Sequence, residues 1–165
     1  RREALLARLA GVLEAPDADG GVAPGVRRLT ADDADACVAL SAAAPETWFE
    51  PHCLSEGPYF GVDGDGGALL AMGGTHVVAA EEAVACLGNV VTAPAARRRG
   101  LGRRVAAALL THLIADVGVR TVALNVRTDN APARGLYASL GFEDVAAFWE
   151  YGEVARPAAG TAPPP

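Results

Sequence analysis

The chain has 165 residues, with 14 basic and 20 acidic side chains and a formal net charge of −6. This length predicts one domain that is large enough to bury a hydrophobic core. The acidic balance argues against a protein whose whole surface binds nucleic acid or an anionic membrane. Every basic residue is arginine, which together with the abundance of alanine suggests a GC-rich bacterial genome.

The cysteines and the hydropathy pattern exclude further classes of protein. Cys37, Cys53 and Cys86 are an odd number for a disulfide framework and lack the paired spacing of a zinc site. No run reaches the roughly 18 apolar residues that a membrane helix needs. We therefore expect a soluble cytoplasmic protein that binds no metal, no nucleic acid and no membrane.

The N-terminal residues carry a helical pattern. Leu5, Leu9 and Leu13 recur at every fourth position, which predicts an amphipathic helix over residues 3–14. Turn-forming residues follow and predict a linker. The predicted organisation is thus an N-terminal helix and linker (1–25), one domain (26–155) and a flexible tail rich in proline and alanine (156–165).

The first half of the predicted domain contains a strand, a helix and a hairpin. A strand is predicted over residues 26–29, and Thr30 then caps a helix that runs to about Leu40. Residues 45–54 predict a short helix or an ordered loop. Residues 59–62 and 68–78 flank a glycine-rich turn, which predicts an antiparallel hairpin, and a further strand covers residues 84–92.

The second half begins with the clearest helix, over residues 101–115, where leucine or valine at every fourth position forms an apolar stripe. Residues 121–128 alternate as a strand. Asn130 caps a last helix that ends before Gly141, and residues 142–153 return as one or two strands. This order predicts an α/β (α+β) fold, in which helices cover both faces of a mixed sheet.

Arginines gather between the strand at 84–92 and the long helix. Five of the 14 lie within residues 97–104, and no acid occurs from Ala83 to Ala115. Gly100 and Gly102 lie among them. Free N–H groups at a helix start, glycines that admit an anion and the positive charge predict a phosphate or pyrophosphate site. A solvated surface remains an alternative. A P-loop and a Rossmann fingerprint do not fit, because the required lysine and third glycine are missing.

Two stretches carry a family resemblance. Residues 91–102 (VTAPAARRRGLG) resemble the acetyl-CoA-binding motif of the GNAT superfamily of N-acetyltransferases, and residues 124–127 (LNVR), 130–133 (NAPA) and 136–142 (LYASLGF) resemble its final strand–helix–Gly-Phe signature. Residues 74–76, 88–90 and 124–126 also resemble the glycine N-acyltransferase-like branch. The resemblance implies a central, mostly antiparallel sheet with a splay between the fourth and fifth strands.

The resemblance also implies that acetyl-CoA lies in this splay, with its pyrophosphate on the arginine-rich loop. The implied binding residues are Val90, Val91, Thr92, Arg97, Arg98, Arg99, Gly100, Leu101, Gly102, Arg103, Asn130 and Tyr137. Tyr137 matches the tyrosine that protonates the leaving thiolate. As alternatives, Asn130 serves only as a helix cap and Tyr137 only as a core side chain.

The general base is harder to identify, because the strand at 84–92 carries no acid where some relatives have a glutamate. His76 is a candidate, since its ordinary pKa lies near neutrality. The other candidates are Glu50, His52, Glu81 and Glu82. Proton transfer through water is an alternative. Trp48, Phe49 and Glu50 are expected to form the wall of the acceptor site, although both aromatic residues could simply cover the sheet.

The sequence thus predicts an enzyme that transfers an acetyl or short acyl group from acetyl-CoA to a primary amine by direct attack, without a metal. A non-catalytic acyl-CoA-binding or sensing domain is the second hypothesis. An RNA-binding loop is a third, which the acidic balance and the second motif disfavour. A homodimer is compatible with the sequence, and the identity of the amine is not readable from it.

Overall fold

The computed structural model describes residues 2–9, 25–44, 47 and 49–150, and of residues 2–9 only the backbone. The strands are β1 (Arg2–Leu9), β2 (Arg27–Arg28), β3 (Tyr59–Asp63), β4 (Leu69–Ala79), β5 (Val84–Thr92), β6 (Thr121–Arg127) and β7 (Phe142–Glu150). The helices are α1 (Ala34–Ala42), α2 (Cys53–Glu56), α3 (Leu101–Thr111), which continues as a π-helical turn over His112–Asp116, and α4 (Ala131–Ala138). Short 3-10 turns cover Ala31–Asp33 and Pro94–Ala96.

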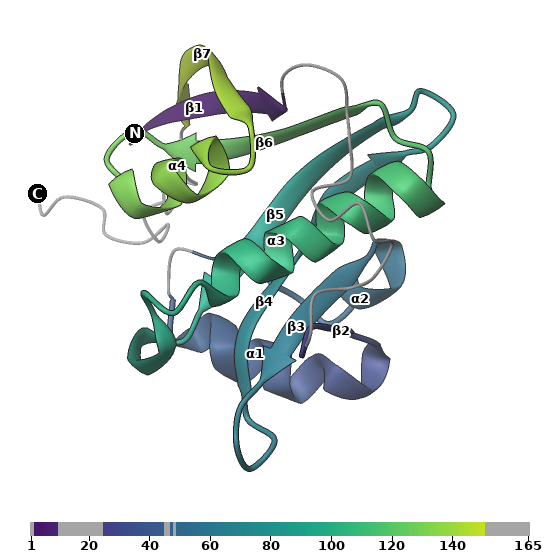
Figure 1. The fold of residues 1–165 in the computed structure, drawn as a ribbon, viewed down its shortest axis with the longest axis vertical. Coiled ribbons are helices and arrows are strands. Elements are labelled where there is room, and N and C mark those ends of the chain that lie inside the picture. Colours follow the sequence, from purple (N-terminus) through teal and green to yellow (C-terminus); the bar gives the residue numbers. More distant parts are fainter. Residues whose placement is uncertain (1, 10–24, 45–46, 48, 151–165) are drawn as a thin grey trace, which may run out of the picture.

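The strands form one mixed sheet in the order β2-β3-β4-β5-β6-β1-β7 (Figure 1). Only β5 and β6 run parallel, and every other neighbouring pair is antiparallel. The predicted α/β fold with a mixed, mostly antiparallel sheet is therefore confirmed.

The predicted N-terminal helix is wrong. Residues 2–9 form β1, which pairs with β6 along one edge and with β7 along the other. This strand lies between β6 and β7, which are both distant from it in the sequence. The local pattern that predicts a helix carries no information on such a pairing. Leu5, Ala7 and Leu9 fit a period of two as well as Leu5 and Leu9 fit a helix, so tertiary pairing decides. The predicted tail and most of the predicted linker lie outside the described residues.

Two hydrophobic clusters pack on opposite faces of the sheet, because neighbouring residues of a strand point to opposite sides. Phe60 belongs to the cluster under α3, and Tyr59 belongs to the cluster under α1 and α2. The α3-side cluster includes Ala85, Leu87, Val105, Leu109, Leu110, Leu113, Val122 and Leu124. The α1-side cluster includes Cys37, Leu40, Cys53, Leu54, Tyr59, Met72 and Val91. None of the helices in the described ranges combines the length and the apolar character needed to cross a membrane.

The position of the site follows from the parting of β5 and β6. These strands pair only from Val84 opposite Thr121 to Leu87 opposite Leu124. Beyond that point β6 continues against β1, whereas β5 turns away with β4 (Figure 1). The splay predicted between the fourth and fifth strands of the domain is therefore confirmed, and it leaves one edge of β5 without a partner strand among the described residues.

Candidate active site

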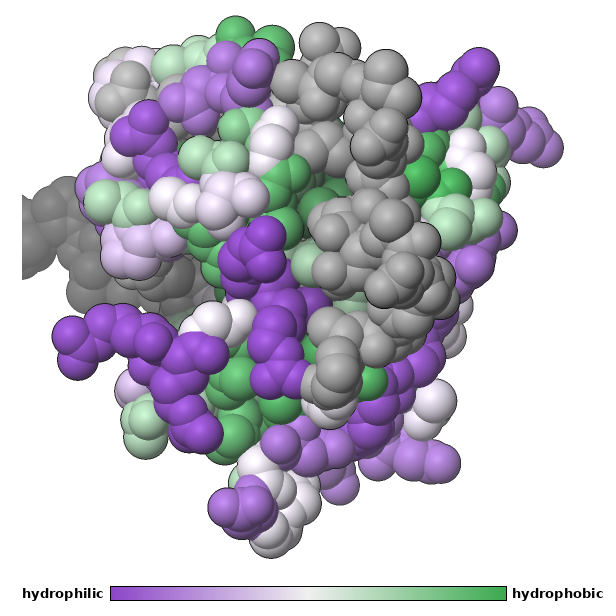
Figure 2. Space-filling view, in the orientation of Figure 1, coloured by the Kyte–Doolittle hydropathy of each residue, from purple (hydrophilic) through white to green (hydrophobic). Residues whose placement is uncertain are grey.

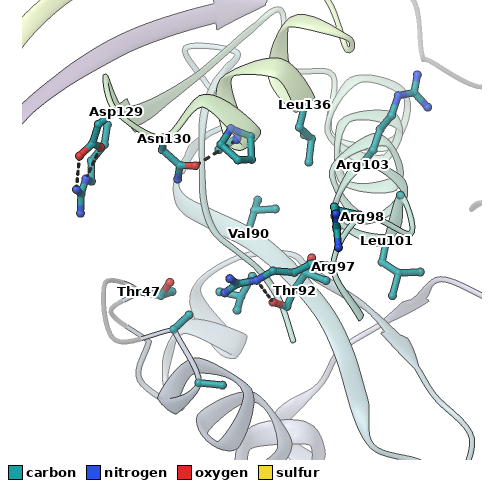
Figure 3. Close-up of a pocket in the computed structure, with 18 residues that line it drawn as sticks. Thr47, Val90, Thr92, Arg97, Arg98, Leu101, Arg103, Asp129, Asn130 and Leu136 are labelled. Carbon is teal, nitrogen blue, oxygen red and sulfur yellow. Dashed lines mark hydrogen bonds and ion pairs between the residues drawn. The ribbon is translucent and has the colours of Figure 1, made fainter. Parts of the chain in front are cut away.

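A pocket of about 970 Å³ opens at this splay (Figure 3). Four parts of the chain line it: the segment just after α1, the second half of β5, the start of α3, and the segment from the end of β6 into α4. The lining residues are Ala43, Ala44, Thr47, Val90, Val91, Thr92, Arg97, Arg98, Gly100, Leu101, Gly102, Arg103, Arg127, Asp129, Asn130, Pro132, Ala133 and Leu136. Ten of the twelve binding residues predicted from the sequence, Asn130 among them, line this pocket, whereas Arg99 and Tyr137 do not.

The start of α3 supplies backbone donors to the pocket. Gly100 caps the helix in the left-handed conformation, with a φ of +75°, which glycine adopts without steric cost. Arg104 N–H donates to the Gly100 carbonyl at 3.0 Å and makes the first helical bond. The N–H groups of Leu101, Gly102 and Arg103 precede it and have no acceptor within the helix. They form the positive end of the helix dipole, where an anion is stabilised.

Arginine side chains surround this helix start. Hydrophilic side chains gather over the loop that leads into α3, at the left of the view in Figure 2. Arg97 Nε donates to the Thr92 carbonyl at 3.4 Å, and Arg103 Nε donates to Ser139 Oγ at 3.3 Å. The Arg98 guanidinium has no hydrogen-bond or ion-pair partner among the described residues. Arg98 is therefore the cation best placed to meet a phosphate.

Glycine at position 102 keeps the pocket open beside β5. A Cβ atom built on Gly102 would lie 3.2 Å from Leu136 Cδ1 and 3.2 Å from Thr92 Oγ1. Both neighbours line the pocket. A larger side chain here would fill the space between α3, α4 and β5, so the residues present suit a ligand that lies close to the backbone.

Asn130 and Tyr137 occupy different surroundings, although both belong to the same predicted signature. Asn130 lines the pocket, and its Oδ1 caps α4 by accepting from Ala133 N–H at 3.2 Å. Tyr137 instead lines a smaller neighbouring pocket of about 300 Å³, and its ring meets Phe142 edge to face at 5.7 Å. Burial raises the pKa of Tyr137 to about 12, so the phenol keeps its proton. The large pocket is lined by Leu136, the residue before it.

His76 lies near the point where β5 and β6 part, outside the lining of the pocket. Its ring packs on Gly88, where a Cβ would come within 2.1 Å of it. Partial burial lowers the pKa of His76, which favours the neutral imidazole that can accept a proton. The other candidate bases are less well placed: Glu81 and Glu82 lie in the turn between β4 and β5, at the end remote from the splay.

The residues expected to form the acceptor wall, 48–50, lie partly in the core and partly on the surface where the structure describes them. Trp48 lies outside the described residues. Phe49 packs on the α1-side cluster and meets Tyr59 edge to face at 5.7 Å. Glu50 is exposed and pairs with His52, with 3.3 Å between Oε2 and Nδ1. Neither Phe49 nor Glu50 lines the pocket, and of the described residues 47, 49 and 50 only Thr47 does.

Sequence reasoning missed several pocket residues. The segment just after α1, the Arg127–Asp129 pair and Leu136 all line the pocket. Arg127 and Leu136 belong to the recognised signature and Asp129 adjoins it, so all three could have been found from it, whereas no pattern marks Ala43 or Ala44. In the described part of the chain, no three His, Cys, Asp or Glu side chains are grouped to hold a metal ion.

Comparisons with known proteins agree with this geometry. The family model for the Acetyltransferase (GNAT) family matches residues 26–142. The [ribosomal protein bS18]-alanine N-acetyltransferase of Escherichia coli (strain K12) is 44% identical over 81 residues, which cover 47% of this chain and 50% of the relative. The mycothiol acetyltransferase of Beutenbergia cavernae is 40% identical over 107 residues, which cover 65% of this chain and 34% of the relative. The chain thus spans half or less of the length of these curated relatives.

Solved structures show the same fold. A protein of the GNAT family from Novosphingobium aromaticivorans superposes with a TM-score of 0.76 at 29% identity, over 88% of this chain and 61% of the other. The ribosomal-protein-S18-alanine N-acetyltransferase of Escherichia coli superposes with a TM-score of 0.58 at 31% identity, over 73% of this chain and 78% of the other.

Proposed function

The chain belongs to the GNAT family of acetyltransferases, and on this premise we propose that it transfers an acetyl group from acetyl-CoA to a primary amine. The observation that carries the proposal is the pocket itself. It joins an unpaired strand edge, which suits an extended amide-rich arm, to a helix start with free N–H groups and arginines, which suits a pyrophosphate.

The donor is held by residues from three elements. The pantetheine arm pairs with the backbone of Val90–Thr92, in place of the strand that has turned away. The pyrophosphate lies on the N–H groups at the start of α3, with Arg98 beside it. The Asn130 amide contacts the arm, because its oxygen is used by the helix cap and its nitrogen is left to donate.

The reaction is a direct attack in a ternary complex. The neutral amine adds to the thioester carbonyl, and the oxygen of the tetrahedral intermediate becomes negative. A backbone N–H of residues 88–92, the half of β5 that does not pair with β6 and is called the free half below, donates to this oxygen. The intermediate then breaks its C–S bond, and the acetyl group stays on the nitrogen, which gives its second proton to solvent. The CoA thiolate takes a proton from Tyr137, which reaches the sulfur from the smaller adjoining pocket, and the phenolate is reprotonated by solvent. The phenol retains that proton at neutral pH because burial raises its pKa to about 12.

The amine must lose a proton before it attacks, since a primary ammonium has a pKa near 10. We assign this proton to His76, whose lowered pKa keeps it neutral and able to accept. His76 lies on β4 beside Gly88, where β5 begins to part from β6. A chain of waters can carry the proton from the pocket to the imidazole.

The acceptor is a primary amine that enters beside the end of α1. Thr47 lines the pocket after this helix, and the exposed carboxylate of Glu50 follows three residues later in the sequence, which favours a cationic amine. One relative acts on an alanine of ribosomal protein bS18, so an N-terminal α-amino group heads the acceptors to be tested. All three cysteines are free thiols, which suits the reducing bacterial cytoplasm that we propose as its compartment.

Incubation with acetyl-CoA and an amine panel tests the proposal. The panel holds a peptide that begins with alanine, a small aliphatic amine and a polyamine, and mass spectrometry with chromatography follows the acetylated product and free CoA. We expect equal amounts of both, only when protein and acceptor are present together. Binding of acetyl-CoA without acetylation of any amine would favour the non-catalytic sensing domain. No binding of acetyl-CoA would contradict the proposal.

A further inference from the structure

Asn89 has a backbone conformation that is rare in a strand. Its φ is +53°, in the left-handed region, which asparagine tolerates better than most residues. Gly74 of β4 lies opposite Gly88, and Met72 lies opposite Val91. Two residues of β5 therefore face one residue of β4, which defines a β-bulge with Asn89 as its left-handed member.

The bulge changes which face of the sheet the side chains of β5 occupy. Before it, Ala85 and Leu87 belong to the α3-side cluster. After it, Val91 belongs to the α1-side cluster, although 85, 87 and 91 are all odd positions. Val90 instead turns toward α3, since a Cβ on Gly73 would meet Val90 and Val105 within 3.1 Å. The direction of the free half of β5 is thus set at Asn89.

A buried side-chain contact holds this conformation. Asn89 Nδ2 donates to Tyr59 Oη at 2.8 Å, and both side chains are buried. The Tyr59 ring lies flat over Gly74, where a Cβ would come within 2.4 Å of three ring atoms. Phe49 packs edge to face on the same ring. Burial raises the pKa of Tyr59 well above its usual range, so a neutral phenol accepts this bond.

We propose that Asn89 and Tyr59 are positioning residues for acyl transfer: their hydrogen bond fixes the bulge, so that the backbone N–H groups of the free half of β5 point at the thioester carbonyl. This inference rests on the proposed function and adds two residues that do not line the pocket. An oxyanion donor must be held in place before the reaction, because its contribution depends on a distance of about 2.7–3.1 Å.

Infrared spectroscopy of bound acetyl-CoA, labelled with ¹³C at the acetyl carbonyl, reads this donor directly and needs no acceptor. A hydrogen bond lowers the carbonyl stretching frequency relative to the ligand in solution. We expect this lowering with the native protein and the loss of most of it in Tyr59→Phe and Asn89→Ala. Acetyl-CoA affinity should fall by about 3- to 10-fold, the worth of one hydrogen bond, while CoA affinity stays the same.

Two further variants separate positioning from stability. Asn89→Gly keeps the left-handed backbone without the side chain, so we expect a frequency between those of the native protein and Asn89→Ala. Leu54→Ala opens a hole in the same cluster and should destabilise the fold without moving the frequency. If Asn89→Ala does not fold, Tyr59→Phe alone tests the positioning role, because it removes only the phenol oxygen.

The outcomes distinguish the two proposals. A native frequency in Tyr59→Phe, or a frequency equal to that in solution in the native protein, would overturn the positioning role and leave the acetyltransferase proposal standing. Failure of the native protein to bind either CoA or acetyl-CoA would overturn both.

Discussion

The two halves of β5 belong to one continuous strand and have different surroundings. Residues 84–87 are paired on both edges, with β4 on one side and β6 on the other. Among the described residues, 88–92 pair only with β4, and their other edge faces the pocket. One strand can therefore stabilise the sheet over its first half and bind a ligand over its second. Where the neighbouring strand turns away, the backbone N–H and C=O groups of β5 are free to bind a ligand instead.

The paired half should matter mainly for stability. Leu87→Ala removes a side chain that is only 2% exposed, in the α3-side cluster. We expect the free energy of unfolding to fall by about 2–5 kcal/mol in chemical denaturation. The folded fraction should bind acetyl-CoA as the native protein does. A large loss of affinity with little loss of stability would break the distinction between the two halves.

Tyr137 should matter mainly for turnover. It lies on α4, whose first residues line the same pocket as the free half of β5. We expect Tyr137→Phe to lower kcat by about 10- to 1000-fold with little change in acetyl-CoA affinity, because the ring contact with Phe142 remains. Since the pKa of Tyr137 is raised to about 12, the native rate should not fall as pH rises through 10. A native kcat in the phenylalanine variant, measured where chemistry limits the rate, would reduce Tyr137 to a packing role.

A bulky residue beside the free half should block the ligand. In Gly102→Leu the new side chain enters the space between Leu136 and Thr92. We expect acetyl-CoA affinity in calorimetry to fall by about 5- to 150-fold, as overpacking costs about 1–3 kcal/mol. Gly135→Leu is the matched control, because a Cβ there meets no atom within 4 Å. Equal affinities in both variants and the native protein would contradict the assigned position of the ligand.

The smallest effect should come from the exposed charge at the start of α3. We expect Arg98→Ala to weaken acetyl-CoA binding by about 2- to 5-fold at low salt, and less as salt screens the charge. Arg120→Ala, at a position that does not line the pocket, provides the control for net charge. A loss that is independent of salt, or is the same in both variants, would argue against a direct phosphate contact.

Much of this architecture could be predicted from the sequence, because the features that build the pocket are local. The apolar stripe of α3, the glycines and arginines at its start and the Asn130 cap are all visible in short windows. Features that depend on pairing were missed: β1 was predicted as a helix, and the contact between Tyr59 and Asn89 joins residues 30 positions apart. The bulge at Asn89 appears only once the register of β4 against β5 is known.

Hydrogen exchange of the β5 amides, with and without acetyl-CoA, tests the central claim most directly. Amides of residues 84–87 should be protected in both states, because partner strands cover both edges. Amides of residues 88–92 that point away from β4 should exchange readily without ligand and become protected with it, together with those at the start of α3. Binding of acetyl-CoA without added protection in residues 88–92 would show that the free half of β5 does not hold the ligand.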